Sequence, residues 1–213
     1  MTDGLQTRDS HSATLDSALR GRIESFLDAG QLDCAVQTAR NMLRDQPGLR
    51  TWRFLRKVTE SAAARPAGLK VFKVALLSSF AIEFAHDALM AYGFVNGLKI
   101  EIYQGGFGAF RQELLDPASA LYGWEPDAVV LAVQGEDWVP GAYGGDPASG
   151  EQDNTRLVEE FRSEVTALAS SLRARSNAPL FIHNFAPPTG RRLGILDANS
   201  ADAPGRRGTR LND

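Results

Sequence analysis

The sequence predicts an α/β fold with a doubly wound, mainly parallel sheet, preceded by an α-helical appendage. Three observations predict this class. Residues 69–196 alternate short apolar segments with helical patterns, which is the rhythm of βαβ units. Residues 128–133 form an unbroken apolar run, typical of a strand that is buried on both faces of a sheet. Residues 154–175 carry one apolar stripe at helical spacing, as expected for a helix that covers such a sheet.

The N-terminal part has a purely helical pattern. Residues 1–14 contain few apolar side chains, and we expect them to be disordered. Residues 15–68 are expected to form a helical appendage of a hairpin plus one further helix. Its breaks fall at Ala29-Gly30 and at residues 45–48, where glycine and proline favour the end of a helix.

The segment from Gly30 to Pro47 resembles one tetratricopeptide-type helical hairpin. Such repeats are stable as stacked copies, so we expect this single hairpin to dock on the domain that follows. Within the hairpin, Cys34 is expected to be a small buried side chain. Residues 65–68, with the sequence Arg-Pro-Ala-Gly, form the expected hinge between the two parts.

The α/β domain is expected at residues 69–196. We predict strands at 71–77, 98–103, 127–133 and 179–182, and helices at 81–92, 110–115 and 154–175. Residues 197–213 are small and polar, and we expect a flexible or incomplete tail there. Truncation of the sheet at its C-terminal end stays open at this stage.

Composition narrows the function classes. The chain has 213 residues and a net charge of -3, which gives no support for electrostatic binding of nucleic acid. A local basic cluster on the third helix has a simple interpretation as the solvated face of that helix; it comprises Arg50, Arg53, Arg56 and Lys57.

Cysteine content and hydropathy set further bounds. The single Cys34 excludes an internal disulfide framework and a zinc site built from several cysteines. No apolar run reaches the roughly 20 residues that a membrane-spanning helix needs. Residues 1–14 also lack the apolar core of a signal peptide, so we expect a cytoplasmic protein.

Polar or glycine-rich segments follow the predicted strands. In order along the chain they are Ser78-Ser79, Gly105-Gly106, Gln134-Gly135-Glu136-Asp137 and His183-Asn184. Because ligands bind beyond the carboxyl ends of parallel strands, these segments are expected to meet at one edge of the sheet. Together they supply the groups that acyl transfer at a serine requires: a nucleophile, a base and backbone N–H donors.

In that interpretation Ser79 is the nucleophile, His183 the base and Asp137 the residue that orients the base. The expected oxyanion or ligand-binding residues are Ser78, Gly105, Gly106, Gly135 and Asn184. A structural alternative stays open, because serine is also a favoured helix N-cap and glycine often serves only a turn. Glu136 argues against a working hydrolase, since it adds negative charge where an oxyanion needs donors.

Two common cofactor sites are absent from the sequence. No Gly-x-Gly-x-x-Gly fingerprint follows the first strand, and no Walker-type phosphate loop occurs. We therefore expect no dinucleotide, and no cofactor is assigned to this chain.

Several motifs together resemble the FkbH family. They are Val74-Ala75-Leu76-Leu77-Ser78-Ser79-Phe80, Glu101-Ile102-Tyr103, Phe110 to Pro117, Ser119-Ala120-Leu121-Tyr122, Pro126 to Leu131, and Phe181 to Pro187. The resemblance spans roughly residues 70–195. It implies an SGNH-hydrolase-like, flavodoxin-like three-layer region that precedes a haloacid-dehalogenase-type domain. It also implies loading of a glycerate-derived unit onto the phosphopantetheine arm of an acyl carrier protein, for polyketide-type biosynthesis.

The chain departs from that family in one catalytic motif. The dehalogenase-type domain needs Asp-x-Asp-x-Thr, whose first aspartate becomes phosphorylated, and the sequence contains no such motif. Mg²⁺ is therefore implied only where a dehalogenase-type domain follows this region.

The match to the SGNH pattern is partial. The Gly-Asp-Ser block falls on Leu77-Ser78-Ser79, and the glycine block on Gly105 or Gly106. The Gly-x-Asn-Asp block falls on residues 134–137, with Glu136 in place of asparagine. The C-terminal Asp-x-x-His block is absent, and His183 lies one strand too early to replace it.

Three functions follow as hypotheses. The first is an accessory SGNH-like domain of an FkbH-type enzyme, which recognises an acyl carrier protein. The second is an active serine esterase or acyltransferase that uses Ser79 and His183. The third is a non-catalytic protein-interaction module built on the helical hairpin. Neither nucleic acid nor membrane is expected as a partner.

Overall fold

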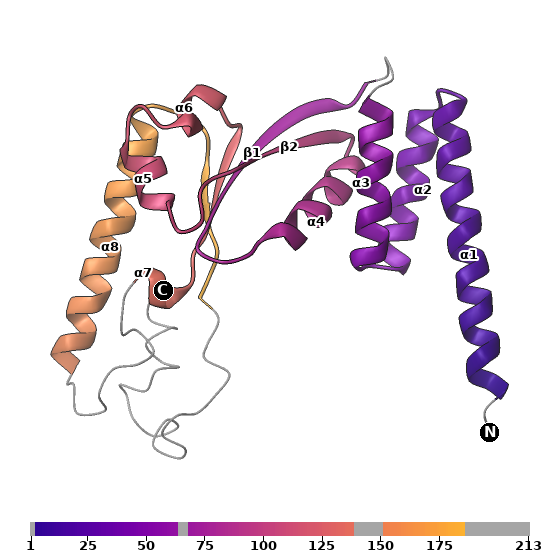
Figure 1. The fold of residues 1–213 in the computed structure, drawn as a ribbon, viewed down its shortest axis with the longest axis horizontal. Coiled ribbons are helices and arrows are strands. Elements are labelled where there is room, and N and C mark those ends of the chain that lie inside the picture. Colours follow the sequence, from indigo (N-terminus) through magenta and orange to yellow (C-terminus); the bar gives the residue numbers. More distant parts are fainter. Residues whose placement is uncertain (1–2, 64–67, 139–150, 186–213) are drawn as a thin grey trace. The chain divides into compact units, whose positions relative to one another are not determined.

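The computed structural model describes residues 3–63, 68–138 and 151–185 (Figure 1). These residues form two compact units. Unit 1 contains the residues up to Phe72 together with Ile82–Glu101. Unit 2 contains Lys73–Ala81 and the residues from Ile102 onward.

Unit 1 is mainly helical. Its helices are α1 (Asp3–Asp28), α2 (Leu32–Asp45), α3 (Leu49–Ala63) and α4 (Glu83–Phe94). Helix α1 ends just before Gly30, whose φ of 71° is easy only for glycine. Figure 1 shows α1, α2 and α3 side by side, and α4 packs against α3.

Two details of unit 1 differ from the sequence predictions. Helix α1 begins at Asp3, although we expected disorder over residues 1–14. No proline interrupts the first 28 residues, so the helical backbone can extend toward the N-terminus. The prediction that Cys34 is buried is wrong, because the structure leaves this side chain exposed. Ala35 and Ala39 occupy the buried face of α2 in its place.

The core of unit 1 joins α4 to the three preceding helices. Its buried members are Ile23, Leu27, Ala35, Ala39, Met42, Leu43, Leu55, Val58, Ala91, Phe94 and Val95. The contacts of α4 explain why residues 82–101 belong to the helical unit, although the chain reaches them through the first strand. Burial of this apolar surface is the dominant favourable term in folding.

The strands of one four-stranded sheet contain residues of both units. The strands are β1 (Lys70–Ser78), β2 (Leu98–Gln104), β3 (Ala128–Ala132) and β4 (Leu180–Ile182), in the order β2-β1-β3-β4. The β1–β3 and β3–β4 pairs are parallel, and Ser78 lies opposite Ala132. The order runs outward in both directions from the neighbouring pair β1 and β3. This is the doubly wound α/β class that the sequence predicts, and the prediction is confirmed.

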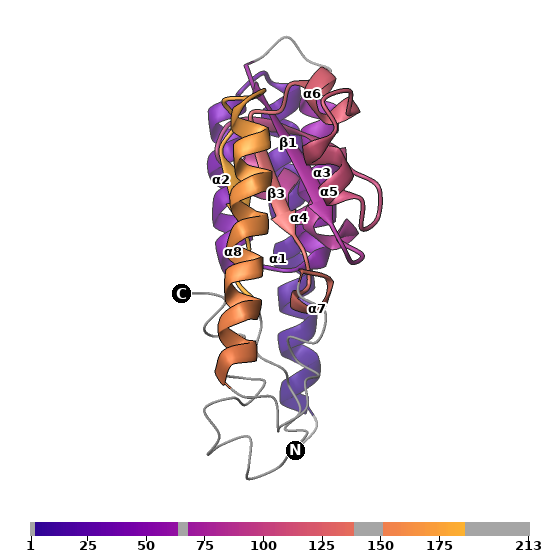
Figure 2. The ribbon, with the colours of Figure 1, turned by 90° about the vertical axis from the view of Figure 1, so that its left-hand side faces the viewer.

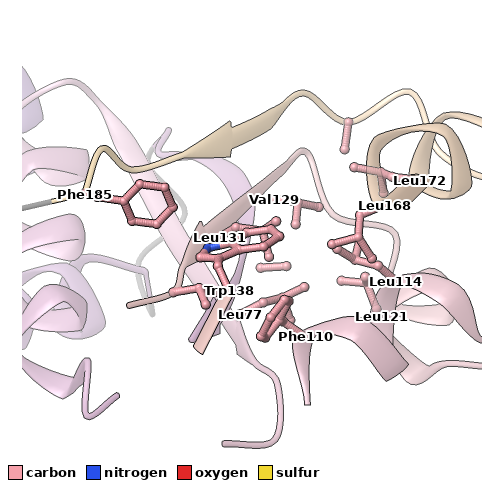
Figure 3. Packing of buried hydrophobic residues seen from close by; sticks show 13 residues of the cluster. Leu77, Phe110, Leu114, Leu121, Val129, Leu131, Trp138, Leu168, Leu172 and Phe185 are labelled. Carbon is pink, nitrogen blue, oxygen red and sulfur yellow. The ribbon is translucent and has the colours of Figure 1, made fainter. Parts of the chain in front are cut away.

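In unit 2, helices α5 (Phe110–Leu115), α6 (Ala120–Trp124) and α8 (Glu151–Arg173) pack on the sheet (Figure 2). A short helix, α7 (Gly135–Trp138), follows β3. Alternate strand residues point into this core, because side chains of a strand alternate between its two faces. The buried members are Ala75, Leu77, Phe110, Leu114, Leu121, Val129, Leu131, Val133, Trp138, Leu168, Leu172, Ala178 and Phe185 (Figure 3).

No helix within residues 3–63, 68–138 and 151–185 combines the length and the hydropathy that crossing a bilayer would require.

Candidate functional site

The candidate site lies at the carboxyl ends of β1 and β3. These neighbouring strands connect to β2 on one side and to β4 on the other, so the direction of winding reverses between them. Such a reversal opens a crevice at the carboxyl edge, where doubly wound proteins bind ligands. The register places Ser78 directly opposite Ala132, and both strands end there.

Ser79 connects these two strand ends. Its backbone N–H donates to the carbonyl of Ala132 at 3.1 Å. Its hydroxyl oxygen accepts a hydrogen bond from the backbone N–H of Gln134 at 2.9 Å. The residue is only 8% exposed, so little of the hydroxyl faces solvent. Ser79 therefore fixes the turn that leads into α7. It does not cap the helix after β1, because α4 (Glu83–Phe94) has Ile82 at its N-cap and no side-chain cap hydrogen bond.

The glycine loop after β2 lies beside the same edge. The N–H of Gly105 donates to the carbonyl of Leu76 at 3.1 Å, and the N–H of Gly108 donates to the carbonyl of Ser78 at 2.9 Å. A Cβ atom on Gly105 would lie 2.6 Å from Cδ2 of Leu77, so a larger residue here would force the leucine to move. Gly106 is exposed. Backbone hydrogen bonds thus join this loop to the end of β1.

Helix α7 carries two of the predicted residues. Gly135 is buried at its start, whereas Asp137 is exposed. The carbonyl oxygens of Asp137 and Trp138 accept hydrogen bonds from Nη2 of Arg111, at 3.1 Å and 3.3 Å. Arg111 also forms an ion pair with Glu164 on α8. This arginine holds α7 in position, a structural role that the sequence does not reveal.

His183 follows β4, which pairs with β3. Its backbone N–H donates to the carbonyl of Leu131 at 3.2 Å, and its ring lies 5.9 Å from the ring of Phe80. Nδ1 lies 2.8 Å from the carbonyl oxygen of Asn184, which is exposed. The imidazole is thus held by an aromatic neighbour and by its own backbone segment.

Hydrogen bonds join some of the predicted site segments to one another but not all of them. Backbone and hydroxyl hydrogen bonds join Ser79, the glycine loop and the start of α7. Among the described residues, no hydrogen bond links Ser79 to His183 or His183 to Asp137. A serine nucleophile needs a base within hydrogen-bond reach to remove its proton. A catalytic triad is therefore not assembled among the described residues of this edge.

Phe107 is an additional candidate at this edge. It lies in the loop between Gly105 and Gly108 and is 79% exposed. A large apolar side chain that protrudes from the surface offers contact area to a partner or ligand. A pattern of glycines around an aromatic residue after a strand is the signal that could have identified it.

A second feature of unit 2 is a pocket next to the glycine loop. This pocket of about 230 Å³ is lined by Ala109, Gln112, Glu113, Asp116, Ser119 and Ala120. The Glu113 carboxylate accepts hydrogen bonds from the hydroxyls of Tyr103, at 3.0 Å, and Ser119, at 2.5 Å. Burial raises the pKa of Tyr103 to about 12, and the hydrogen bond to Glu113 adds to this effect. The two hydroxyls hold the carboxylate at the wall of the pocket.

Metal ligands do not gather at the candidate site. In the described parts of the chain, no group of three or more His, Cys, Asp or Glu side chains is placed to hold a metal ion. Strand β1 ends on Ser78 and Ser79 follows it, so hydroxyl groups and no carboxylate stand at this strand end. These residues do not fit a Mg²⁺ site, and we assign none to them.

Comparisons with known proteins support the fold alone. A scan against protein-family models finds no match, and a search of curated proteins finds none either. One similar solved structure is the N-terminal part of the protein BF1531 from Bacteroides fragilis, described as containing a phosphatase domain complexed with Mg. The two chains are 17% identical, with a TM-score of 0.57.

The similarity covers 76% of this chain and 40% of the Bacteroides chain, so the protein spans less than half of that neighbour. At this identity the likeness establishes an α/β architecture shared with part of a phosphatase-containing protein. The description of the neighbour names no serine hydrolase, and the comparison gives no support for SGNH-type activity.

Proposed function

We propose that this chain is an accessory, SGNH-like α/β region of an FkbH-type enzyme. Its role is to recognise an acyl carrier protein, and in particular the phosphopantetheine arm that carries the glycerate-derived unit. The contact site is the edge formed by Ser79, Gly106, Asp137 and His183, with Phe107 beside it. The phosphoryl chemistry belongs to a different domain.

The observation that carries this proposal is the hydrogen bond from the Gln134 N–H to the Ser79 hydroxyl. It gives the serine a structural role at the point where a doubly wound fold binds ligands. His183 is turned toward the carbonyl of Asn184, at 2.8 Å from Nδ1. Both contacts favour binding over hydrolysis at this edge.

The neighbouring structure is compatible with the proposal. That protein contains a phosphatase domain complexed with Mg, and this chain corresponds to a minority of its length. The sequence here has no Asp-x-Asp-x-Thr motif. A division of labour between a recognition region and a phosphatase-type domain accounts for both facts.

A direct binding experiment tests the proposal. The chain is titrated into a fluorescently labelled, phosphopantetheinylated acyl carrier protein, and anisotropy is followed. We expect micromolar binding that the Phe107→Ala variant weakens about tenfold, because it removes exposed apolar contact area. Phe181→Ala is the matched control, since Phe181 is also largely exposed but lies on the edge strand β4.

Two outcomes would contradict the proposal. One is absence of binding by the folded chain, and the other is equal weakening by both phenylalanine variants. The esterase alternative has its own test with a fluorophosphonate probe. That alternative requires labelling of the wild-type chain that Ser79→Ala abolishes, whereas the recognition role predicts no labelling of either protein.

A further inference from the structure

The strongest additional feature is a basic face on α3, which lies wholly within unit 1. Its cationic side chains are Arg50, Arg53, Arg56 and Lys57. At about 100° per residue these positions fall within an arc of about 120° on the helix. This arrangement concentrates positive charge on one side of a protein whose net charge is -3.

Two of the carboxylates that accompany these cations, Asp16 and Asp87, are buried beneath them. Asp16 on α1 lies 3.3 Å from Nη2 of Arg50, and the side-chain exposures are 6% for the aspartate and 79% for the arginine. Asp87 on α4 lies 3.3 Å from Nε of Arg53. It also lies 3.0 Å from Nε of Arg56. Glu60 on α3 is the exception, since it is 55% exposed and lies 3.9 Å from Nη1 of Arg56. The cations of this face outnumber that single exposed carboxylate, so the outer surface is positive around Arg50, Arg53 and Lys57.

The buried aspartates also hold the guanidinium groups in place. Arg53 uses its Nε atom for Asp87, and its Nη atoms have no hydrogen bond or ion pair to the described residues. Lys57 likewise has no ion pair within the described part of the chain. A guanidinium that is already ordered loses less conformational entropy when it binds a carboxylate through its outer nitrogens.

The spacing of the cations indicates the kind of partner. Arg50 and Lys57 are seven residues apart, which corresponds to about 10 Å along a helix. One phosphate or one carboxylate cannot contact both side chains while these extend straight out from the helix. A second helix with carboxylates at matching intervals can, because residues three, four and seven apart share one face of a helix. Nucleic acid fits poorly, since the face has few cations and the chain is acidic overall.

We propose that the basic face of α3 is a docking surface for an acidic helix of another protein, held by carboxylates that meet Arg50, Arg53 and Lys57. Such a surface gains its affinity and its association rate from charge complementarity. This inference does not depend on the proposed role of the Ser79 edge. The two surfaces are tested by separate variants.

The test uses the full chain and a defined probe. The probe is a fluorescein-labelled, alanine-based helical peptide with glutamates at positions i, i+3, i+4 and i+7, and its reference is the same peptide with glutamines. Anisotropy at low ionic strength is expected to show binding of the glutamate peptide alone. The double variant Arg50→Glu/Lys57→Glu should bind roughly tenfold more weakly or worse, because two attractive contacts become repulsive.

The matched control is Arg156→Glu/Arg162→Glu on α8, where both arginines are exposed and the change in charge is identical. It should leave affinity within about twofold of the wild type. Circular dichroism checks that each variant is folded. If loss of the Arg50–Asp16 pair unfolds the double variant, the single variant Lys57→Glu replaces it in the binding experiment. The proposal fails if the glutamate peptide does not bind, if both double variants lose affinity equally, or if duplex DNA or anionic phosphatidylserine vesicles bind more tightly than the peptide.

Discussion

Gly105 shows how one backbone position shapes the candidate site. It lies where the loop after β2 reaches the end of β1, and its N–H donates to Leu76. Leu77, which a Cβ on Gly105 would meet at 2.6 Å, is fully buried in the core of unit 2. The leucine side chain has little room to move aside, so the close approach of loop and strand depends on glycine.

We therefore expect Gly105→Ala to destabilise the protein by about 1–3 kcal/mol through overpacking. Gly123→Ala is the control, because nothing lies within 4 Å of the added Cβ and the residue is in helix α6. That change should be neutral or stabilising by up to about 1 kcal/mol. Urea denaturation followed by circular dichroism measures both. Equal stability of Gly105→Ala and the wild type would contradict the close approach, whereas partial rescue by Leu77→Val would support it.

The raised pKa of the Tyr103 hydroxyl leads to a second prediction about a single residue. Burial and the Glu113 carboxylate raise its pKa to about 12, from an ordinary value near 10. The folded state therefore favours the neutral phenol. Its contribution to stability is complete below pH 10 and is lost as the pH rises from about 10 to about 12, because the unfolded chain ionises first.

Absorbance near 295 nm during a pH titration measures this behaviour. The chain has four tyrosines, and Tyr103→Phe should remove the component that titrates near pH 12. Glu113→Gln should shift that component toward lower pH while leaving the effect of burial. A component that is unchanged in Tyr103→Phe would show that another residue is responsible.

The amino-acid pattern predicted where the site residues lie along the strands, but it did not predict which atoms they contact. It placed Ser79, Gly105 and Gly135 at strand ends, and the structure places them there. It could not say that the Ser79 hydroxyl accepts from Gln134, since a capping serine and a nucleophilic serine have the same local sequence. The error at Cys34 has a similar origin, because its neighbour Ala35 fits the apolar pattern of α2 equally well.

Among the elements, Arg111 connects three helices of unit 2. It lies on α5, pairs with Glu164 on α8 and donates to the last carbonyls of α7. A guanidinium that binds a carboxylate and backbone oxygens together is more strongly held than an ordinary surface ion pair. Its side chain is 41% exposed, so solvent reduces the electrostatic part of this contribution.

Replacement of Arg111 by methionine keeps an apolar stem and removes these contacts. We expect a loss of about 1–2 kcal/mol in the free energy of unfolding. Arg156→Met is the control, because Arg156 forms an exposed pair with Glu160 one helical turn away on α8. That control should change stability by less than about 0.5 kcal/mol. Two variants with the same midpoint of denaturation would show that Arg111 does not hold α7.

The sequence predicted the long elements well and the short ones poorly. Helices α2, α3 and α8 carry an apolar stripe over many turns, and each strand has a clear apolar segment. Helices α6 and α7 have five and four residues, too few for any period to be visible. Both were therefore missed, although α7 carries Gly135 and Asp137 of the candidate site.

At the scale of the whole molecule, α4 determines how the chain divides. The sequence suggests a boundary near residues 65–68, where a helical pattern gives way to strands. The structure groups Ile82–Glu101 with the preceding helices, because Ala91, Phe94 and Val95 are buried in the core of unit 1. Local periodicity cannot reveal which neighbour an apolar helix covers, since that choice is made by tertiary packing.

A truncated chain tests this division. A fragment of residues 69–213 lacks α1, α2 and α3, and it exposes the face of α4 that carries Ala91 and Phe94. It also loses the partners of buried Asp87, which are Arg53 and Arg56. We expect the fragment to aggregate or to bind a hydrophobic dye, because its apolar surface is uncovered. We also expect protease to cut it within residues 82–97, because the unpaired charge of Asp87 disfavours the native state.

The matched control removes residues 2–14 only, which leaves Ile23 and Leu27 of α1 to cover the core of unit 1. This shorter chain should keep the protease resistance of the full chain. A monomeric, protease-resistant fragment of residues 69–213 would show that α4 belongs energetically to the sheet. In that case the helices before residue 68 would be a separable appendage, as the sequence pattern alone suggests.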